Sequence, residues 1–223
     1  TTGLAEKVGV HGPKTVLLPS KDHPTDTNEM SMRNLAYPLA WEAIFDYVGF
    51  PAFFKPYAGG GWKNVYRVKT PEEFFDIYNK TGQLVMMLQE EIQFTAYYRC
   101  YCIDRKHVRI MEYDPGKPFH EQYSHKPQPI PRDLRTSMRG AVLKLNHVLG
   151  YDFNTVELAI REGVPYAIDF GNPAPDADYH SVGPDNFEWV VEKTATMAIR
   201  HARRFSPKKP RIEWGDFVRS SVG

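Results

Sequence analysis

The stretch AFFKPYAGGGWKNVYRV, residues 52–68, joins two apolar segments through three consecutive glycines. The segment 50–54 is apolar and ends at Lys55 and Pro56, and an alternating pattern resumes at 65–68. Two strands of a hairpin are therefore predicted. Glycine loses more backbone entropy on folding than any other residue, so a triple run needs a physical reason. An ordinary flexible hairpin is one explanation, and backbone amides that approach phosphate oxygens closely are another.

The composition excludes several classes of protein. With 223 residues, of which 42% are hydrophobic, the chain is long enough for one large domain or two small ones. The net charge of +1, from 28 basic and 27 acidic residues, gives no support for a nucleic-acid partner. No apolar run reaches the length needed to cross a bilayer, and no signal peptide is evident. The sequence therefore predicts a cytoplasmic protein.

The two cysteines and the first residues support two further expectations. Cys100 and Cys102 alternate along a predicted strand and are too close in sequence for a good disulfide, so they are expected to be reduced, half-buried thiols. The chain begins at Thr1, and its first residues resemble the end of a helix. We expect that an upstream segment, up to a whole domain in length, precedes it.

The remaining patterns predict helices and strands that alternate without a parallel βαβ rhythm, which indicates an α+β protein. Loops are expected at 19–34 and 114–133. A helix begins at Thr70, which can cap it, and Pro71 follows at its first turn. Further helices are expected at 4–9, 38–48, 134–149 and 185–204, and further strands at 15–18, 83–88, 97–103, 107–113, 154–160 and 165–170.

Two candidate nucleotide-binding features lie in the first half of the chain. Lys55 stands directly before the glycine loop, which contains Gly59, Gly60 and Gly61. The segment QEEI follows the buried strand 83–88 and consists of Gln89, Glu90, Glu91 and Ile92. A strand end that offers backbone groups beside a carboxylate suits an adenine edge and a ribose hydroxyl. A solvated strand end would explain QEEI equally well.

Two carboxylates in the second half form a candidate metal site. Glu157 and Asp169 lie on two predicted strands that flank a turn at Glu162 and Gly163, so they are expected roughly opposite each other. Adjacent carboxylates repel unless a cation lies between them, and oxygen ligands are those that Mg²⁺ prefers. Asn172 follows in the turn GNPAPD and could supply a neutral oxygen. Local hydrogen bonds to each carboxylate and a simple turn asparagine are the alternatives.

Taken in order, these motifs resemble the ATP-grasp superfamily over roughly residues 4–200. FFKP is similar to its nucleotide-binding lysine segment, AGGGWKNV to its phosphate-covering loop, and QEEI to its adenine-binding hinge. VEL and IDFGNP look like its metal-binding motifs, although the spacing from Asp169 to Asn172 is one residue longer than is usual there. YYRCYCI followed by VRIMEY resembles a strand pair of the peptide-ligase and glutathione-synthetase-like branch.

The resemblance implies a fold, a site and an activity. Two α+β subdomains would clasp ATP between them, with 1–50 as the N-terminal segment, 51–91 as the lid, 92–205 as the metal- and substrate-binding part, and 206–223 as a tail. ATP and Mg²⁺, or Mn²⁺ in its place, would be the cofactors. Lys55, the three glycines, Trp62 and 89–92 would bind the nucleotide. Glu157, Asp169 and Asn172 would hold the metal, and Arg99 would be catalytic, stabilising the charge of an acyl-phosphate.

The implied activity is an ATP-dependent ligase that joins a carboxylate to an amine or a thiol. Its partners would be small-molecule or peptide substrates, with neither nucleic acid nor membrane, and a homo-oligomer is compatible with this class. A non-catalytic ATP-binding regulatory module is the main alternative, and a phosphotransferase of the same fold is another. The loop 114–133 is expected to determine substrate specificity, since loops carry function on a fixed scaffold.

Overall fold

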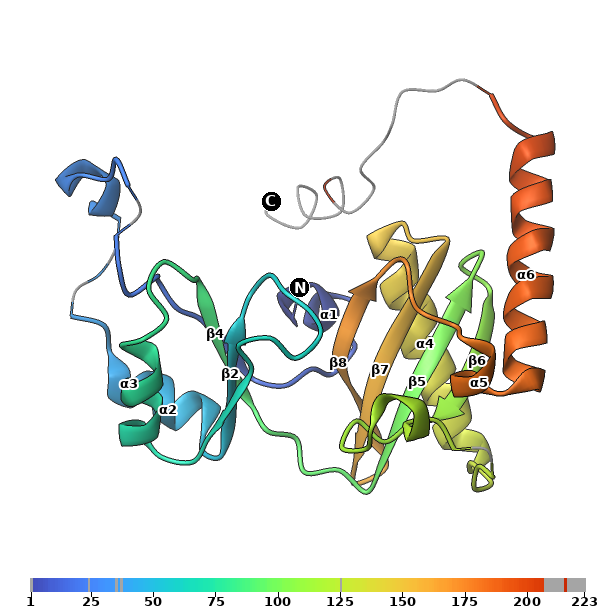
Figure 1. The fold of residues 1–223 in the computed structure, drawn as a ribbon, viewed down its shortest axis with the longest axis horizontal. Helices are drawn as coiled ribbons and strands as arrows, with labels where there is room; N and C mark the ends of the chain where they lie inside the picture. The colour runs from blue at the N-terminus through green and yellow to red at the C-terminus, as the bar shows by residue number, and fades with distance from the viewer. Residues whose placement is uncertain are drawn as a thin grey trace. The chain divides into compact units, whose positions relative to one another are not determined.

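The structure is a computed structural model that describes residues 2–23, 25–34, 36, 38–124, 126–206 and 215. The chain separates into two compact units, Pro13–Ile92 and the combination of Thr1–Gly12 with Gln93–Gly223. Each unit has its own antiparallel sheet (Figure 1) and its own hydrophobic core, as the α+β prediction required. Apart from residues 206 and 215, the tail predicted at 206–223 lies outside the described residues.

The unit Pro13–Ile92 contains a four-stranded sheet in the order β1-β4-β2-β3. The predicted glycine hairpin is confirmed, because Ala52 pairs with Val68 and Phe54 with Tyr66. The predicted cap of the helix that follows this hairpin is confirmed as well, since the hydroxyl of Thr70 accepts a hydrogen bond from the backbone N–H of Glu73. The elements are β1 (Thr15–Leu17), a 3-10 turn (Glu29–Met32), α2 (Trp41–Val48), β2 (Ala52–Pro56), β3 (Tyr66–Val68), α3 (Pro71–Tyr78) and β4 (Met86–Glu90).

One strand of this unit differs from the sequence prediction. We expected the strand at 83–88, but β4 spans Met86–Glu90, because Gln89 still pairs with both neighbouring strands and Glu90 with Ala52 of β2. Gln89 pairs with Thr15 of β1 and with Phe53 of β2. The first half of QEEI therefore lies within the sheet rather than after it.

The core of this unit is built from aromatic rings that α2 and α3 pack against one face of the sheet. Phe54 of β2 and Phe74 of α3 are both fully buried, and their ring centroids lie 4.8 Å apart in an edge-to-face arrangement. Trp41 of α2 packs against Phe74 at 5.6 Å. Such pairs add stabilisation beyond the area they bury. The opposite face of β2, which carries Phe53 and Lys55, is left outside this core.

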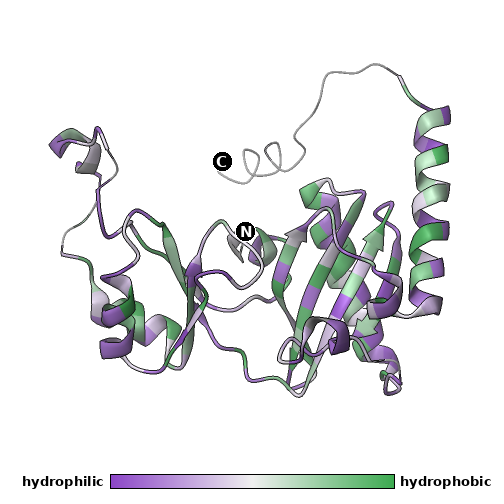
Figure 2. Cartoon of the chain, in the orientation of Figure 1, coloured by the Kyte–Doolittle hydropathy of each residue, from purple (hydrophilic) through white to green (hydrophobic). Residues whose placement is uncertain are grey.

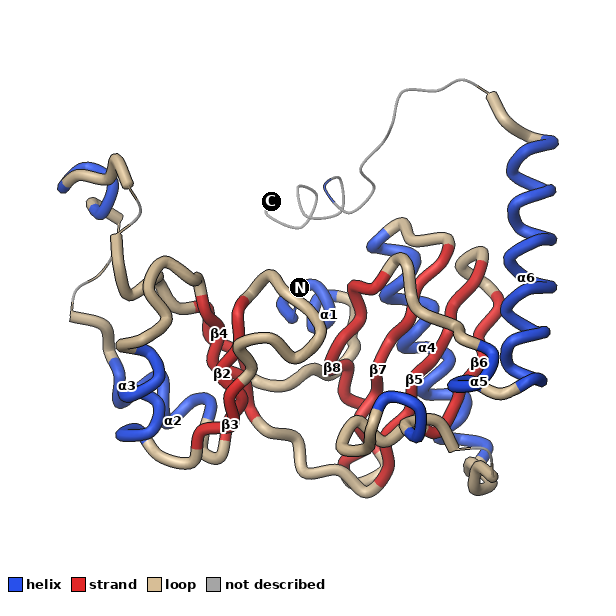
Figure 3. The backbone as a smooth tube through the Cα atoms, viewed as in Figure 1, coloured by secondary structure: helices blue, strands red, loops and turns tan. Residues whose placement is uncertain are grey.

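The second unit contains a four-stranded sheet in the order β6-β5-β7-β8, which α4 covers on one face (Figures 1 and 3). Hydrophobic and hydrophilic residues alternate along its strands (Figure 2), and the hydrophobic set packs against α4. The elements are α1 (Thr2–Lys7), β5 (Ala96–Ile103), β6 (His107–Glu112), a 3-10 turn (Phe119–Glu121), α4 (Arg132–Leu149), β7 (Phe153–Arg161), β8 (Val164–Asn172), α5 (Tyr179–Val182) and α6 (Pro184–Arg203).

Three details of the second unit differ from the sequence prediction. The segment 114–133 is not all loop, because it contains the 3-10 turn Phe119–Glu121 and the first residues of α4. Asn172 is the last residue of β8 rather than part of a turn, because its backbone N–H bonds to the Oδ1 of Asn154 on β7. The short helix Tyr179–Val182 was not predicted.

The cysteines are free, as predicted, but are more deeply buried than expected. Cys100 and Cys102 both have 0% exposure and face α4 from β5. Burial raises the pKa of both thiols, that of Cys102 to about 12. Both groups are therefore neutral thiols that act as small core residues.

The ring cluster yields the first prediction. Phe54→Ala removes a fully buried ring and should lower the free energy of unfolding by about 3–5 kcal/mol, as aromatic-to-alanine changes in cores do. Urea denaturation measures it. Phe53→Ala is the control on the same strand but the opposite face, and should cost much less. Equal losses for the two variants would contradict the assignment of the core face.

Candidate functional site

A row of polar side chains crosses the outer face of the second sheet, opposite α4. Glu157 of β7 pairs directly with Asp169 of β8 on one side and with Arg99 of β5 on the other. Cross-strand partners lie on the same face of a sheet, so two carboxylates and one guanidinium are neighbours across three strands. The near-symmetry of the two carboxylates about Glu162 and Gly163, noted in the sequence, thus corresponds to a real register pair.

Two irregularities in the pairing of β7 with β8 flank Asp169. Leu158 pairs with Ala167, so Ile168 is an additional residue before the carboxylate pair. The next paired residues beyond this pair are Thr155 and Asn172. Thr155 lies two residues from Glu157 on β7, whereas Asn172 lies three residues from Asp169 on β8. A β-bulge accommodates one additional residue and lets strand pairing resume beyond it. The longer spacing from Asp169 to Asn172 is therefore absorbed by the strand, and Asn172 lies opposite Thr155.

Thr155 identifies the face on which Asn172 lies. It pairs with Tyr101 of β5, which belongs to the same face of the sheet as Arg99. Since Thr155 and Glu157 are two residues apart on one strand, they also share that face. The register therefore brings the positions of all three proposed metal ligands, Glu157, Asp169 and Asn172, to the face that carries Arg99.

The Glu157 carboxylate is held by the residues around it. The hydroxyl of Tyr97 donates a hydrogen bond to its Oε2 at 2.7 Å, and the Nη1 of Arg99 lies 3.8 Å from its Oε1. Burial raises the pKa of Tyr97 well above its usual value, and the charges of Glu157 and then Asp169 raise it further. Tyr97 is therefore a permanent hydrogen-bond donor, and both carboxylates are close enough to act on it.

Arg99 is mostly buried and is only partly satisfied. Its side chain is 12% exposed; its Nη1 lies 3.4 Å from the hydroxyl of Tyr113, and the guanidinium stacks over the Tyr113 ring at 5.4 Å. Its Nε is buried and makes no hydrogen bond among the described residues. A buried donor without an acceptor costs about 1–3 kcal/mol, so this nitrogen would gain from an anionic ligand.

The segment 113–123 folds back beside Arg99. The Tyr113 hydroxyl donates to Gln122 Oε1 at 2.7 Å, and Gln122 Nε2 donates to the Lys117 carbonyl at 3.1 Å. Tyr113 and Tyr123 stack edge-on at 5.1 Å. The first part of the predicted specificity loop is thus tied to the sheet face that carries the charged row.

In the other unit, Lys55 lies on the outer face of its sheet. It pairs with Met87 of β4 and follows Phe54, whose side chain enters the core, so alternation directs Lys55 to the opposite face. Gln89 of the predicted hinge is buried, and its Nε2 donates to Thr15 Oγ1 at 3.0 Å. These residues belong to adjacent strands of a single sheet.

The acidic residues of QEEI already have partners in the structure. Glu90 Oε2 accepts the backbone N–H of Lys14 at 3.1 Å, and Glu91 Oε2 accepts Arg67 Nε at 2.6 Å. Ile92 is buried at 5% exposure. The side chains of this segment therefore stabilise the end of the strand, and the backbone after that end, at Glu91 and Ile92, is the part suited to an adenine edge.

The glycine loop has an open and unusual backbone. Gly61, Trp62 and Asn64 all adopt positive φ angles, between 58° and 62°, which glycine tolerates best. A Cβ added at Gly60 would meet nothing within 4 Å, and Gly60 has no left-handed φ. Trp62 is 63% exposed, and its ring contacts Phe53 edge-on at 6.4 Å. The fold itself explains glycine at 61 but gives no reason for glycine at 60.

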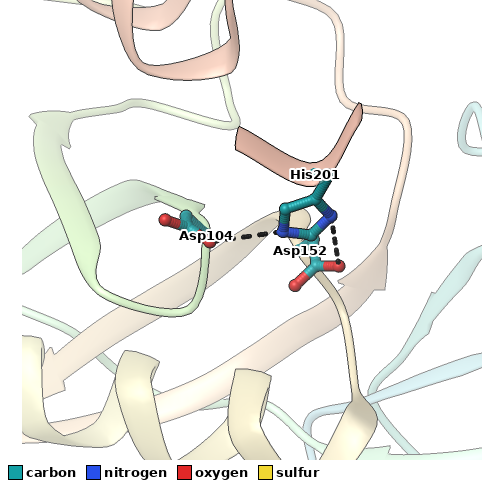
Figure 4. A group of neighbouring side chains, drawn as sticks. All are labelled: Asp104, Asp152 and His201. Carbon is teal, nitrogen blue, oxygen red and sulfur yellow. Dashed lines mark ion pairs between the residues drawn. The ribbon is translucent and has the colours of Figure 1, made fainter. Parts of the chain in front are cut away.

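A second charged cluster joins the end of α6 to the sheet of the second unit. His201 of α6 lies 3.7 Å from Asp104, in the β5–β6 turn, and 3.9 Å from Asp152, which precedes β7 (Figure 4). Arg200 and Lys106 bind Asp104, and Arg105 binds Asp152 at 2.9 Å. Because arginine and lysine already neutralise both carboxylates, we interpret the cluster as an ion-pair network rather than a metal site. No local pattern in the sequence indicates it.

Comparisons with solved structures identify the fold. The chain is similar to D-alanine–D-alanine ligase from Bacillus anthracis, with a TM-score of 0.66 and 16% identity over 91% of this chain and 68% of that one. N5-carboxyaminoimidazole ribonucleotide synthetase from Thermus thermophilus gives 0.59 and 15%, over 88% and 51%. The ATP-grasp ligase PsnB, solved with minimal precursor, Mg and ADP, gives 0.55 and 14%, over 86% and 57%.

These likenesses confirm the ATP-grasp fold predicted from the sequence. Because the sequence identities are only 14–16%, the likenesses show the fold alone. The chain spans between about half and two thirds of the length of these structures. No protein-family model matches the chain, and no curated protein sequence matches it. Among the described residues, no helix is long and apolar enough to cross a membrane.

The ion-pair network yields the second prediction. Asp104 has a left-handed backbone at φ 62°, which asparagine also adopts readily, so Asp104→Asn removes the charge and keeps the turn. The side chain is only 6% exposed, and the free energy of unfolding should fall by about 1–3 kcal/mol. Urea denaturation checks this. Glu188→Gln on the exposed face of α6 is the control, and an equal change in both variants would contradict the role of the network.

Proposed function

We propose, because the chain has the ATP-grasp fold, that it carries out ATP- and Mg²⁺-dependent ligation of a carboxylate to an amine or a thiol through an acyl-phosphate. The row of Arg99, Glu157 and Asp169 on one sheet face is the observation that carries the proposal. A structural role alone does not account for two adjacent carboxylates beside a buried arginine whose Nε has no acceptor among the described residues.

In this proposal, the unit Pro13–Ile92 binds the nucleotide. Lys55, on the outer sheet face, meets phosphate oxygens as a point charge, and the loop 59–61 donates backbone N–H groups to them. Trp62 anchors the loop against Phe53. Within the segment 89–92, the backbone of Glu91 and Ile92 meets the adenine edge, since Gln89 and Glu90 already pair within the sheet.

The second unit supplies the metal ligands. Glu157 and Asp169 are register partners, and Asn172 adds a neutral oxygen from the same face; this all-oxygen set fits Mg²⁺. When bound, the metal would neutralise phosphate charge. Tyr97 and Arg99 contact the Glu157 carboxylate and fix its orientation. The carboxylate pair is therefore prepared for a cation before one arrives.

Arg99 has the second task of binding the anion that forms. Its fork of donors suits an acyl-phosphate or the substrate carboxylate, and its buried Nε would be satisfied by either. Substrate carboxylate oxygen attacks the terminal phosphorus and ADP leaves; the amine or thiol then displaces phosphate and loses its proton. No covalent enzyme intermediate is required.

A non-catalytic ATP-binding module is the second candidate. It predicts ATP binding without ADP release for any pair of carboxylate and amine substrates. A phosphotransferase would release ADP but form no acyl-phosphate. Assay of ADP release over a panel of carboxylates and amines, with hydroxylamine added to trap an acyl-phosphate as a hydroxamate, distinguishes the three functions.

The third prediction concerns the metal site. Asp169→Asn should lower Mg²⁺-dependent ADP release by at least about tenfold, because it removes one anionic ligand, and should change ATP affinity much less. Coupled ADP assay and calorimetry measure the two quantities. Asp185→Asn, at the exposed start of α6, is the control. Undiminished ADP release in Asp169→Asn would remove this residue from the site.

The fourth prediction concerns the nucleotide site. Lys55→Ala should weaken ATP binding at least about tenfold, since a charged contact to phosphate is lost. Gly60→Ala should weaken it as well, if the loop approaches phosphate closely, although the added Cβ meets nothing in the fold. Calorimetric titration with ATP and thermal melting of both variants test this. Unchanged ATP affinity in both variants, with unchanged stability, would favour the plain flexible hairpin.

A further inference from the structure

A groove of about 310 Å³ runs along the outer edge of β6, which is one of the two edge strands of the second sheet. Five consecutive residues of β6, 108–112, line it. Successive residues of a strand point to opposite faces, so five in a row can line one groove only if that groove follows the edge of the strand. Arg135 and Arg139 of α4 and Trp189 of α6 form its walls.

No strand among the described residues pairs with the outer edge of β6. The backbone N–H of Tyr113, just after β6, donates to the carbonyl of Tyr97 on β5. Every second residue before Tyr113, including Arg109, therefore directs its backbone N–H and C=O towards β5. Val108 and Ile110 therefore direct theirs to the groove, and no hydrogen bond from the described residues reaches them there. Farther along, the Glu112 carbonyl accepts the backbone N–H of Ser124, which closes that end of the edge.

Three arginines line the groove, and none of them pairs with a carboxylate in the part of the chain that the structure describes. Arg109, Arg135 and Arg139 make no ion pair among the described residues, whereas Arg67, Arg105 and Arg200 pair with Glu91, Asp152 and Asp104. Arg109 Nε donates to Asn186 Oδ1 at 2.7 Å, which fixes the guanidinium and leaves its other donors available. Arg139 Nη2 donates to the Lys106 carbonyl at 3.1 Å.

The neighbouring groups confirm that this edge is electropositive. Burial lowers the pKa of His107, the first residue of β6; the charges of Lys106, Lys193 and Arg139 lower it further, against an opposing contribution from Glu192, which pairs with Lys193. Glu112 is the one acidic residue that lines the groove, and its Oε2 already accepts the backbone N–H of Gln128 at 2.9 Å. Three arginines thus face one carboxylate that is already engaged.

We propose that the edge of β6 binds a short acidic segment of a partner protein in extended conformation, as an added strand. Backbone groups of Val108 and Ile110 would pair with the segment, and the three arginines would bind its carboxylates, which charge complementarity favours. An exposed strand edge is a template for such pairing. The site is distinct from the row of Arg99, Glu157 and Asp169, and it does not depend on the proposed ligase activity.

The test uses the full chain and a fluorescein-labelled, end-blocked pentapeptide in which glutamate and valine alternate. Fluorescence anisotropy should show saturable binding that weakens as salt is added. Arg135→Ala combined with Arg139→Ala should weaken binding at least about tenfold, because two charged contacts are lost. Arg132→Ala, on the same helix but outside the groove, is the matched control and should bind as the parent chain does.

A second probe separates strand pairing from simple charge attraction without altering the protein. A pentapeptide of the same sequence with N-methylated alternate amides keeps its charges but loses backbone donors. Its affinity should fall at least about fivefold through the loss of hydrogen bonds. Equal binding of the methylated and unmethylated peptides would overturn the proposal, as would equal binding to the arginine double variant or no binding at millimolar peptide.

Discussion

The second sheet is organised around two like charges placed directly opposite each other. Glu157 and Asp169 face one another across β7 and β8, an arrangement that costs free energy unless something offsets their repulsion. The chain offsets part of it with the hydroxyl of Tyr97 and the guanidinium of Arg99. The β-bulges on either side of Asp169 keep it in this position while Ala167 and Phe170 remain in the core. A carboxylate pair held in this way is suited to a cation, and the proposed function follows from that property.

The sheet of the first unit, like that of the second, has two different faces. One face packs in a closed core, and the other carries polar groups. Phe54 enters an aromatic cluster, and Lys55, the next residue, is directed to the outer face. The charged side chains of Glu90 and Glu91 are used to secure the strand end. The glycine loop contacts the sheet through Trp62 and Phe53. In the proposal, the remaining backbone donors of the loop are the groups that a phosphate would engage.

Local signals in the sequence were sufficient for much of the fold. The glycine run and the Glu162–Gly163 turn predicted two hairpins, and the turn placed Glu157 roughly opposite Asp169, although their direct pairing depends on the additional residue Ile168. Thr70 and Pro71 predicted the start of a helix. The features that could not be predicted depend on residues distant in sequence. The bulges lie next to Phe170, which packs in the core, the bond of Tyr97 to Glu157 spans 60 residues, and the groove beside β6 forms only when α4 and α6 flank one strand.

The central claim is that Glu157 and Asp169 together hold a divalent cation in the presence of nucleotide. Electron paramagnetic resonance of Mn²⁺, titrated with the protein and a non-hydrolysable ATP analogue, measures free and bound ion directly and needs no knowledge of the substrate. We expect nucleotide-dependent binding of Mn²⁺ that Glu157→Gln and Asp169→Asn each weaken strongly, while the far-ultraviolet circular dichroism of both variants is unchanged. Mn²⁺ binding that is the same in the parent chain and in both variants would contradict the account.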